Sequence, residues 1–324
     1  MSTAPKVLVL AGGLSHEREV SLRSGRRVSD ALRESGCEVV ESDLDAHLLA
    51  HLDAEAPDLV WPLLHGASGE DGSVRDVLDV VGVPYVGADA AACRRAFDKP
   101  TANDLVGAAG LSVPVSVSLP HSLFRELGAS AVLDALVARL GLPLAVKPTR
   151  GGSALGVTVC DDRADLPRAM VDCFAYGDTA LVQRAVRGRE IAVSVVDTGG
   201  GPLALPPVEV VPAGAAYDYQ ARYTAGGTEY FAPARLDAAL RRRVEEVAVQ
   251  VHRTLGLRDV SRTDLVVGGD GDDAVVGFLE VNVAPGMTET SLLPQAVSAS
   301  GRDLPTVCRG VVDAALVRAR GENA

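Results

Sequence analysis

Residues 278–283 read Phe-Leu-Glu-Val-Asn-Val, an apolar strand pattern that contains two polar residues. Because successive side chains along a strand point to opposite faces, Glu280 and Asn282 should share one face, about 6.5 to 7 Å apart along the chain. Both side chains carry oxygen atoms, which are the ligands that Mg²⁺ prefers. The segment therefore predicts a strand with one polar face that suits a divalent cation.

A second strand with the same pattern is predicted upstream, at residues 263–267. Arg262 and Asp264 share one face there, and the turn-rich residues 268–273 would connect the two strands as a hairpin. Asp264 would then join the two polar residues of the later strand as a third oxygen ligand, for Mg²⁺ bound together with nucleotide phosphates. An exposed hairpin face with ordinary polar residues shows the same alternation, so the spacing alone leaves both interpretations open.

Lysine is rare in this chain, since Lys6, Lys99 and Lys147 are the only lysines among 31 basic residues. Such a bias is typical of genomic base composition, and the remaining lysines are candidates for positions that need a compact ammonium group. Lys147 ends a predicted strand, and the glycine-rich residues 150–156 connect it to another predicted strand at residues 157–159. Backbone N–H groups of such a loop can approach a phosphate closely, although an ordinary hairpin turn has the same composition.

Length and composition fit a globular protein of two or three domains, with 324 residues, 47% hydrophobic residues and a formal net charge of −12. Neither an apolar run of about 18 residues nor a secretory signal occurs, so we expect a cytoplasmic protein without a membrane span. The acidic balance argues against nucleic acid as the main partner. The five cysteines contain no Cys-x-x-Cys pair and are expected to be buried apolar residues.

The first hundred residues alternate strand and helix patterns. Strands are predicted near residues 7–10, 39–40 and 58–64, with an amphipathic helix after the first that ends at Gly36. This alternation predicts an α/β fold with a parallel sheet. His65 follows the third strand, at the carboxyl end where open parallel sheets bind ligands, although a lone histidine is more often structural.

Taken together, the motifs of the chain resemble those of the D-alanine–D-alanine ligases of the ATP-grasp superfamily. They occur in the family's order from residue 7 to about residue 293, which is nearly the whole chain. The motifs are Gly12-Gly13-Leu14-Ser15-His16-Glu17-Arg18-Glu19-Val20-Ser21, Leu64-His65-Gly66 with Gly69-Glu70-Asp71-Gly72, Asp98-Lys99, Val146-Lys147-Pro148 with its glycine loop, residues 217–223, Arg262-Thr263-Asp264, and Glu280-Val281-Asn282 with residues 285–288.

The resemblance implies a three-domain ATP-grasp fold, α/β overall and α+β in its ATP-grasp part. The N-terminal parallel-sheet domain would cover residues 1–97 and help to bind substrate. The central subdomain with the glycine-rich loop would cover residues 98–186, and the C-terminal subdomain with a mobile loop and the metal site residues 187–324. The resemblance also implies a homodimer.

The resemblance further implies a role for each residue that matches a family motif. The ATP-binding residues would be Lys99, Lys147, Gly151, Gly152, Gln183, Glu190 and Arg222. The ligands of two Mg²⁺ ions, which Mn²⁺ could replace, would be Asp264, Glu280 and Asn282. The substrate contacts would be His65, Ser291 and Leu292, and the catalytic set would be Glu17, Ser153, Tyr223, Arg262 and Gly286.

The implied reaction joins two D-alanines at the expense of ATP. Glu17 would hold the ammonium group of the first D-alanine, and Ser153 and Tyr223 would join it in a hydrogen-bonded set that closes two loops over the site. The first carboxylate would attack the γ-phosphate to give an acylphosphate. The second amine would then attack this intermediate, with the oxyanion held by Arg262 and the backbone N–H of Gly286.

The chain departs from the family pattern near the nucleotide and the loops. Gln183 stands where a glutamate usually contacts the adenine amino group, and Arg222 stands where a lysine usually reaches the γ-phosphate. Ala154 replaces a second serine of the glycine loop, and Val283-Ala284 replaces a more polar or bulkier pair. Two alternatives stay open: a divergent paralogue that joins D-alanine or another amino acid to a different partner, and an inactive nucleotide-binding regulator.

Overall fold

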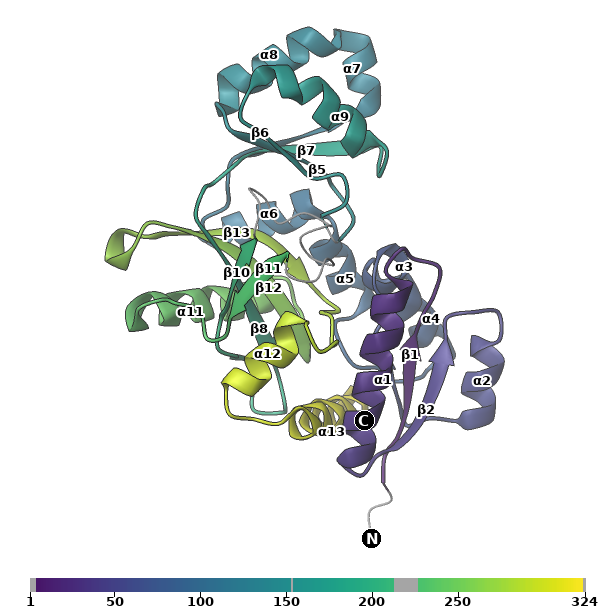
Figure 1. The fold of residues 1–324 in the computed structure, drawn as a ribbon. Helices are drawn as coiled ribbons and strands as arrows, with labels where there is room; N and C mark the ends of the chain where they lie inside the picture. Colours follow the sequence, from purple (N-terminus) through teal and green to yellow (C-terminus); the bar gives the residue numbers. More distant parts are fainter. Residues whose placement is uncertain (1–3, 153, 213–226, 323–324) are drawn as a thin grey trace.

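The computed structural model describes residues 4–152, 154–212 and 227–322, and they form three sheets with their helices (Figure 1). The first sheet has the strand order β2-β1-β3, and β1 runs parallel to both neighbours. Its part of the chain contains β1 (Lys6–Ala11), α1 (Arg18–Glu34), β2 (Glu38–Asp43), α2 (Leu48–Glu55), β3 (Leu59–Pro62), α3 (Ala67–Glu70), α4 (Ser73–Val81) and α5 (Ala90–Phe97). The predicted parallel α/β arrangement is therefore confirmed.

The second sheet is antiparallel, with the order β4-β7-β5-β6. This part of the chain contains α6 (Lys99–Ala108), β4 (Ser116–Pro120), α7 (His121–Leu127), α8 (Ala129–Leu140), β5 (Leu144–Pro148), β6 (Thr158–Cys160), the 3₁₀ turn η1 (Arg163–Asp165), α9 (Leu166–Phe174) and β7 (Thr179–Arg184). Strands β5 and β6 pair directly, with Val146 opposite Thr158, so the predicted strand, glycine loop and strand do form a hairpin. Helices α7, α8 and α9 lie on one side of this sheet, at the top of Figure 1.

The third sheet is antiparallel and has the order β11-β10-β8-β12-β13, with β9 on the end of β8. Its elements are β8 (Arg189–Val196), β9 (Leu203–Ala204), β10 (Val208–Pro212), β11 (Thr228–Phe231), α11 (Ala238–Thr254), β12 (Val260–Gly268), the turn η2 (Gly271–Asp273), β13 (Val275–Asn282), α12 (Leu292–Ala299) and α13 (Leu304–Glu322). Helix α11 buries Leu240, Val244 and Val251, as its apolar stripe predicts. The predicted hairpin of β12 and β13 is also confirmed.

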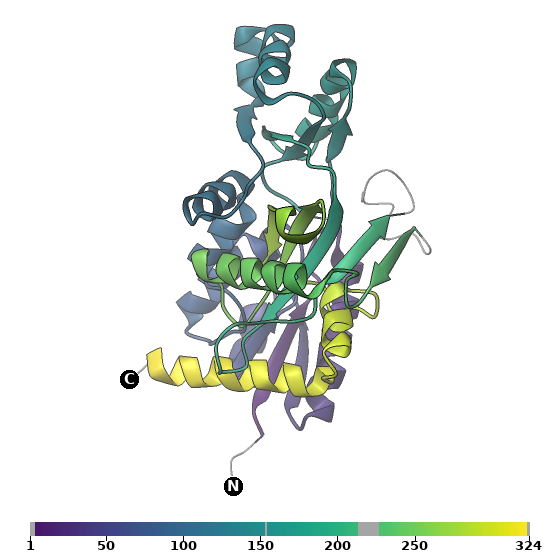
Figure 2. The same ribbon diagram turned by 90° about the vertical axis from the view of Figure 1, so that its left-hand side faces the viewer.

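The last helix returns to the first part of the chain. Helix α13 packs against α1, and one apolar core contains Val28 and Leu32 of α1 together with Val311 and Val312 of α13. Figures 1 and 2 show α13 along the base of the molecule, beside both α1 and α12. The parallel sheet is therefore covered on one side by helices from both ends of the chain.

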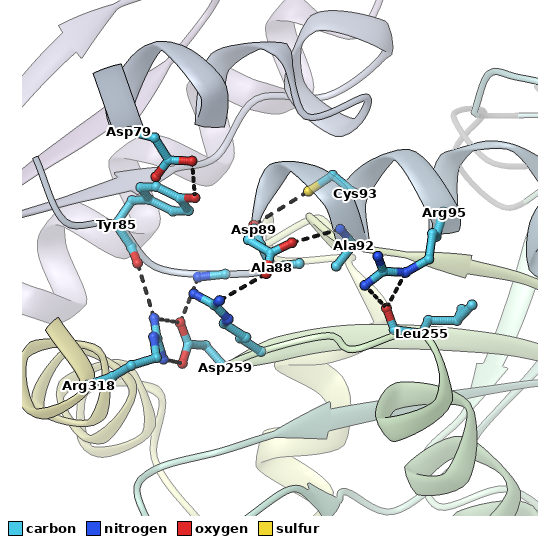
Figure 3. Close-up of polar contacts among 12 residues, drawn as sticks. Asp79, Tyr85, Ala88, Asp89, Ala92, Cys93, Arg95, Leu255, Asp259 and Arg318 are labelled. Carbon is cyan, nitrogen blue, oxygen red and sulfur yellow. Dashed lines mark hydrogen bonds and ion pairs between the residues drawn. The ribbon is translucent and has the colours of Figure 1, made fainter. Parts of the chain in front are cut away.

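A buried carboxylate ties the first and third sheets together (Figure 3). Asp259, which is 2% exposed, directly precedes β12 and accepts hydrogen bonds from the backbone N–H of Gly87 at 2.7 Å and from both terminal nitrogens of Arg318 on α13. Arg258 donates to Asp89, which caps α5, at 2.9 Å. These contacts fix the start of β12 against the N-terminal part of the chain.

All five cysteines are free and buried, as expected from their spacing. Over the described part of the chain, no helix has the length and apolar character that crossing a membrane requires.

Candidate active site

The hairpin of β12 and β13 brings the predicted polar residues onto one face. Arg262 lies opposite Asn282, and Asp264 lies opposite Glu280. The guanidinium group of Arg262 donates from Nε to Oδ1 and from Nη2 to Oδ2 of Asp264, both at 2.7 Å. The amide of Asn282 donates to Oδ2 of Asp264 at 3.3 Å. The spacing argument therefore placed these four side chains correctly.

Lys99 and Lys147 converge on this face from the second part of the chain. Lys99 begins α6, where Asp98 caps the helix, and its Nζ donates to the carbonyl of Gly151 at 2.7 Å and lies 3.6 Å from Oε2 of Glu280. Nζ of Lys147, on β5, lies 3.5 Å from the carbonyl of Leu279. Both lysine side chains are buried, and burial together with the charge of Lys99 lowers the pKa of Lys147 to about 8.

The third lysine of the chain has a different setting. Lys6 donates to Oε2 of Glu55 at 2.8 Å and lies 3.6 Å from Glu38, away from the hairpin. Two of the three lysines are thus part of one buried cationic group.

A cleft lies between the second and third sheets, and Lys99 and Lys147 line it. Apolar side chains from both sheets line it, and polar residues lie among them. The predicted site residues on its walls are Lys99, Lys147, Gly151, Gly152, Gln183, Glu190, Asp264, Glu280 and Leu292. The mixture of apolar side chains, two buried lysines and three carboxylates suits a ligand that is apolar at one end and binds anionic groups and cations at the other.

A second, more polar cavity adjoins the cleft and reaches the first sheet. The predicted residues on its walls are Glu17, His65, Gly152, Arg262, Asn282, Gly286, Ser291 and Leu292. Gly152 and Leu292 line both cavities, so the two spaces are neighbours. Every predicted site residue within the described part of the chain lies on one of these two walls. Ser153, Arg222 and Tyr223 fall outside the described residues, as does most of the predicted mobile loop.

The segment from Gly286 to Ser291 forms one wall of the second cavity. Ser291 stands at the N-terminus of α12, and its Oγ accepts from the N–H of Thr288 at 3.0 Å. A Cβ atom at position 286 would come within 2.8 Å of that Oγ, so a side chain there would displace the Ser291 hydroxyl from its place against Thr288. The N–H of Met287 donates to Ser24 of α1 at 3.0 Å, which joins this wall to the N-terminal part.

The second cavity contains the buried titratable groups His65 and Glu70, and the sequence analysis assigned a role to the first of them alone. Glu70 is buried, and its Oε1 accepts from the N–H of Gly66 at 2.9 Å. Burial, with a further contribution from the charge of Glu17, raises the pKa of Glu70 to about 7. Burial also lowers the pKa of His65, whose Nε2 has no hydrogen-bond partner among the described residues.

Behind this wall lies Arg75, a fully buried arginine of α4 that donates to the carbonyl of Gly69. Glu70 is part of a quoted motif, since it lies between two glycines after a strand, so a signal for it existed. No sequence pattern singles out Arg75, because an arginine in the first turns of a helix is ordinarily expected to be exposed.

The donor set of the hairpin fits a divalent cation. Asp264 and Glu280 face each other across paired strands, and each carboxylate has a cation beside it, Arg262 and Lys99 respectively. No cluster of three or more His, Cys, Asp or Glu side chains suited to a metal occurs among the described residues. The third donor would be the amide oxygen of Asn282, and all three are hard oxygen ligands of the kind that Mg²⁺ prefers.

The departure at Gln183 lies in the cleft. Gln183 pairs with Ala145 across β5 and β7, on the sheet face that also carries Lys147, and its side chain is buried. Its Nε2 donates to the carbonyl of Pro114 at 3.4 Å, so its Oε1 is the atom left to accept from a ligand.

An N-terminal parallel sheet, followed by two antiparallel sheets that enclose a cleft with paired lysines and carboxylates, defines an ATP-grasp protein. A family model described as the C-terminus of D-ala D-ala ligase matches residues 105–313. The chain belongs to the D-alanine–D-alanine ligase family.

The relatives match over nearly the full chain. A D-alanine–D-alanine ligase from Anaeromyxobacter sp. strain K is 39% identical over 317 residues, which cover 98% of this chain and 99% of the relative. A second, from Desulforudis audaxviator, is 38% identical and covers 95% of this chain and 97% of the relative. In both comparisons the aligned region includes the residues between the motifs as well as the motifs themselves.

Solved structures with the same fold include two ligases of different description. The D-alanine–D-alanine ligase of Bacillus anthracis superposes with a TM-score of 0.80 at 27% identity, covering 98% of this chain and 100% of that chain. The VanG D-Ala:D-Ser ligase of Enterococcus faecalis superposes with a TM-score of 0.81 at 26% identity, covering 96% of this chain and 99% of that chain. The B. anthracis ligase has also been solved in complex with ATP.

Proposed function

We propose that this chain is an ATP-dependent ligase that joins two D-alanines through an acylphosphate, for the synthesis of peptidoglycan precursors. The observation that carries this proposal is the pair of adjoining cavities, one lined by lysines and carboxylates and the other by Glu17, His65 and Arg262. Family membership supports the same activity. A reaction in which a phosphoryl group moves from ATP to a carboxylate requires two such neighbouring spaces.

The cleft would bind ATP. Lys99 and Lys147 would lie against the phosphates, with the backbone of Gly151 and Gly152 closing over them. The purine would lie farther along the same sheet face, where Oε1 of Gln183 would accept from its amino group. Glu190, on the opposite wall, would contact the rest of the nucleotide, and Arg222 is proposed at the γ-phosphate from its motif alone.

Two Mg²⁺ ions, which Mn²⁺ could replace, would be held by Asp264, Glu280 and Asn282. When bound, they would neutralise the charge that develops on the transferring phosphoryl group. Arg262 would keep the Asp264 carboxylate in place, because its two hydrogen bonds fix both oxygens.

The second cavity would bind both D-alanines. Glu17 would pair with the ammonium group of the first, with its carboxylate near His65 and directed at the γ-phosphate. Attack by this carboxylate breaks the bond between the β–γ bridging oxygen and the γ-phosphorus, and yields ADP and an acylphosphate. Ser153 and Tyr223 are proposed as partners of Glu17 that close the loops, which keeps water from the acylphosphate.

The amine of the second D-alanine would then attack the acylphosphate carbon, and phosphate would leave. Arg262 and the N–H of Gly286 would donate to the oxygen that becomes negative in this step. Ser291 and Leu292 would contact the carboxylate of the second D-alanine, at the start of α12. The product is the dipeptide together with ADP and phosphate.

The domain division into residues 1–97, 98–186 and 187–324 is part of the proposal, as are a homodimer and a cytoplasmic location. A separate apolar core around the central sheet, whose buried members lie between residues 124 and 182, supports the central subdomain. The core between α11 and the third sheet also contains Ala92 of α5 and Ala102 of α6, so it joins the three parts of the chain.

The test is ADP formation with ATP and Mg²⁺ in the presence of D-alanine, D-serine, D-lactate and L-alanine, with products identified by mass spectrometry. We expect D-alanine alone to stimulate ADP formation and to yield D-alanyl-D-alanine. A product that contains D-serine or another partner in preference to a second D-alanine would favour the paralogue. ATP binding without turnover on any substrate would favour the regulator, and either result would overturn the proposal.

A further inference from the structure

Asp43 lies at the carboxyl end of β2 and holds the loop between β1 and α1. Its Oδ1 accepts from the backbone N–H of Gly13 at 2.7 Å and from Nη1 of Arg18 at 3.1 Å. Its Oδ2 accepts from Nη2 of Arg18 at 2.5 Å. Nη1 of Arg18 also donates to the carbonyl of Gly13 at 2.9 Å. Asp43, Gly13 and Arg18 therefore form a closed set of hydrogen bonds, here called the loop clasp.

The backbone of the loop depends on two successive glycines. Gly12 and Gly13 have φ angles of +103° and +76°, which L side chains rarely adopt. A Cβ atom on Gly12 would overlap the carboxylate of Asp43 and lie 2.8 Å from Nη1 of Arg18. The N–H of Gly12 donates to Ser21 of α1 at 2.8 Å. The loop is thus held at its start by α1 and at its centre by Asp43.

The clasp leads directly to the second cavity. Arg18 is the first residue of α1, and the preceding Glu17 lines the cavity, whereas Asp43 lines neither of the two site cavities. The N–H of Glu17 donates to Oγ of Ser15 at 2.9 Å. This Oγ packs closely against Gly66, since a Cβ atom on Gly66 would lie only 2.9 Å from it. A shift of the clasped loop would therefore move Glu17 relative to the wall that carries His65.

We propose that Asp43 is a positioning residue for the first substrate, acting through Gly13 and Arg18 on the carboxylate of Glu17. This inference rests on the proposed function, in which Glu17 pairs with the ammonium group of the first D-alanine. It assigns a role to a residue outside the cavity walls that none of the motifs contains.

The clasp contributes more to geometry than to stability. The side chains of Arg18 and Asp43 are 44% and 29% exposed, and ion pairs with that exposure contribute little free energy of folding. Hydrogen bonding to Arg18 nevertheless lowers the pKa of Asp43 below its ordinary value, so the carboxylate stays charged at neutral pH. Asp43→Ala should therefore fold normally while its loop becomes free to move.

The kinetic test compares Asp43→Ala, Asp43→Asn and a matched control, Asp76→Asn, with the wild type. Asp76 pairs with Arg94 at 2.7 Å on the outside of α4, with both side chains 54% exposed. We expect Asp43→Ala to raise the Michaelis constant of the first D-alanine about tenfold, which is less than the ~10²-fold loss that a displacement of about 1 Å can cause. The constants for ATP and for the second D-alanine should stay within about twofold, since Glu17 contacts neither.

Asp43→Asn should give an intermediate increase, because its amide oxygen can still accept from Gly13 while the charge that holds Arg18 is lost. Asp76→Asn should behave as the wild type. An unchanged constant for the first D-alanine in Asp43→Ala, or an equal rise in all three constants together with a lower melting temperature, would overturn the proposal.

Hydrogen–deuterium exchange tests the clasp without turnover. Amides of residues 12–18 should exchange faster in Asp43→Ala than in the wild type or Asp76→Asn, and unchanged exchange would overturn the proposal. If the wild type forms no D-alanyl-D-alanine, the proposed function fails, and the exchange of this segment still decides whether Asp43 holds the loop.

Discussion

Arg262 and Asp264 lie on the same face of β12 and share two hydrogen bonds of 2.7 Å, so that one guanidinium group fixes both oxygens of a proposed metal ligand. The pair is mostly buried, with side-chain exposures of 10% and 17%. A single arginine is thus placed to orient a carboxylate and to face the second cavity at the same time.

Replacement of Arg262 by methionine should reduce kcat about 10² to 10³-fold, because a donor to the developing oxyanion is lost. Arg262→Lys should restore part of the rate at best, since an ammonium group cannot donate to both oxygens of Asp264 in the same plane. ADP release under saturating substrates measures the effect, with Arg168→Met on the exposed side of α9 as the control. A kcat within about twofold of the wild type in Arg262→Met would contradict the assigned role.

Glu280→Gln should abolish ADP formation while the protein stays folded. The substitution removes a proposed metal ligand and the carboxylate that lies 3.6 Å from Nζ of Lys99. Asp273→Asn, in the exposed turn of the same hairpin, is the matched control. Removal of divalent cations by EDTA should likewise stop turnover of the wild type, and Mg²⁺ or Mn²⁺ should restore it. Normal turnover of Glu280→Gln at ordinary Mg²⁺ concentrations would contradict the metal assignment.

Glu70 should make the free energy of unfolding fall as the pH rises. Its pKa is about 7 in the folded protein and 4.5 ordinarily, so between these values the folded state retains a proton that the unfolded state releases. The contribution of Glu70 to stability is therefore most favourable below pH 4.5 and decreases as the pH rises to about 7. The total decrease in the free energy of unfolding is on the order of 3 kcal/mol, at ~1.4 kcal/mol per pKa unit.

The measurement is urea unfolding of the wild type and Glu70→Gln at pH 5 and pH 8. Glutamine keeps an acceptor for Gly66 and carries no charge, so the variant should gain stability relative to the wild type on going to pH 8. An equal difference between the two proteins at both pH values would show that Glu70 is already ionised at pH 5.

Arg318→Met should destabilise the protein by about 3 to 5 kcal/mol, because it leaves the carboxylate of Asp259 buried without its cation. Asp259 is 2% exposed and would keep only the N–H of Gly87 among the partners described above. The exposed pair of Arg168 and Asp172, 3.8 Å apart, provides the control, for which we expect less than about 1 kcal/mol. Equal melting temperatures of Arg318→Met and the wild type would contradict the importance of this junction.

The sequence predicted those features that follow from local periodicity. Alternation along two strands placed Arg262, Asp264, Glu280 and Asn282 on one face, and the hairpin register confirms that interpretation. The scarcity of lysine indicated Lys99 and Lys147, which the structure places in one cleft. In both cases the decisive information lies within a few residues of chain.

Features that depend on long-range packing could not be predicted from the sequence. Asp259 meets Gly87 across a separation of 172 residues, and nothing near either position indicates the other. Asp43 is one of several acidic residues along the edge strand β2, and only the folded loop distinguishes it. Arg75 likewise lines a small cavity together with residues far away in the sequence, such as Val260 and Met287, so its burial depends on the folded arrangement.

The return of α13 to α1 affects how the protein is made. N-terminal domains usually fold first as the chain leaves the ribosome. Here Val28 and Leu32 of α1 share a core with Val311 and Val312 of α13. Helix α13, which covers this side of the first sheet, is therefore translated long after the sheet itself. The nascent chain must carry this apolar surface uncovered through most of elongation, and we expect it to depend on chaperone protection until residues 304–322 emerge.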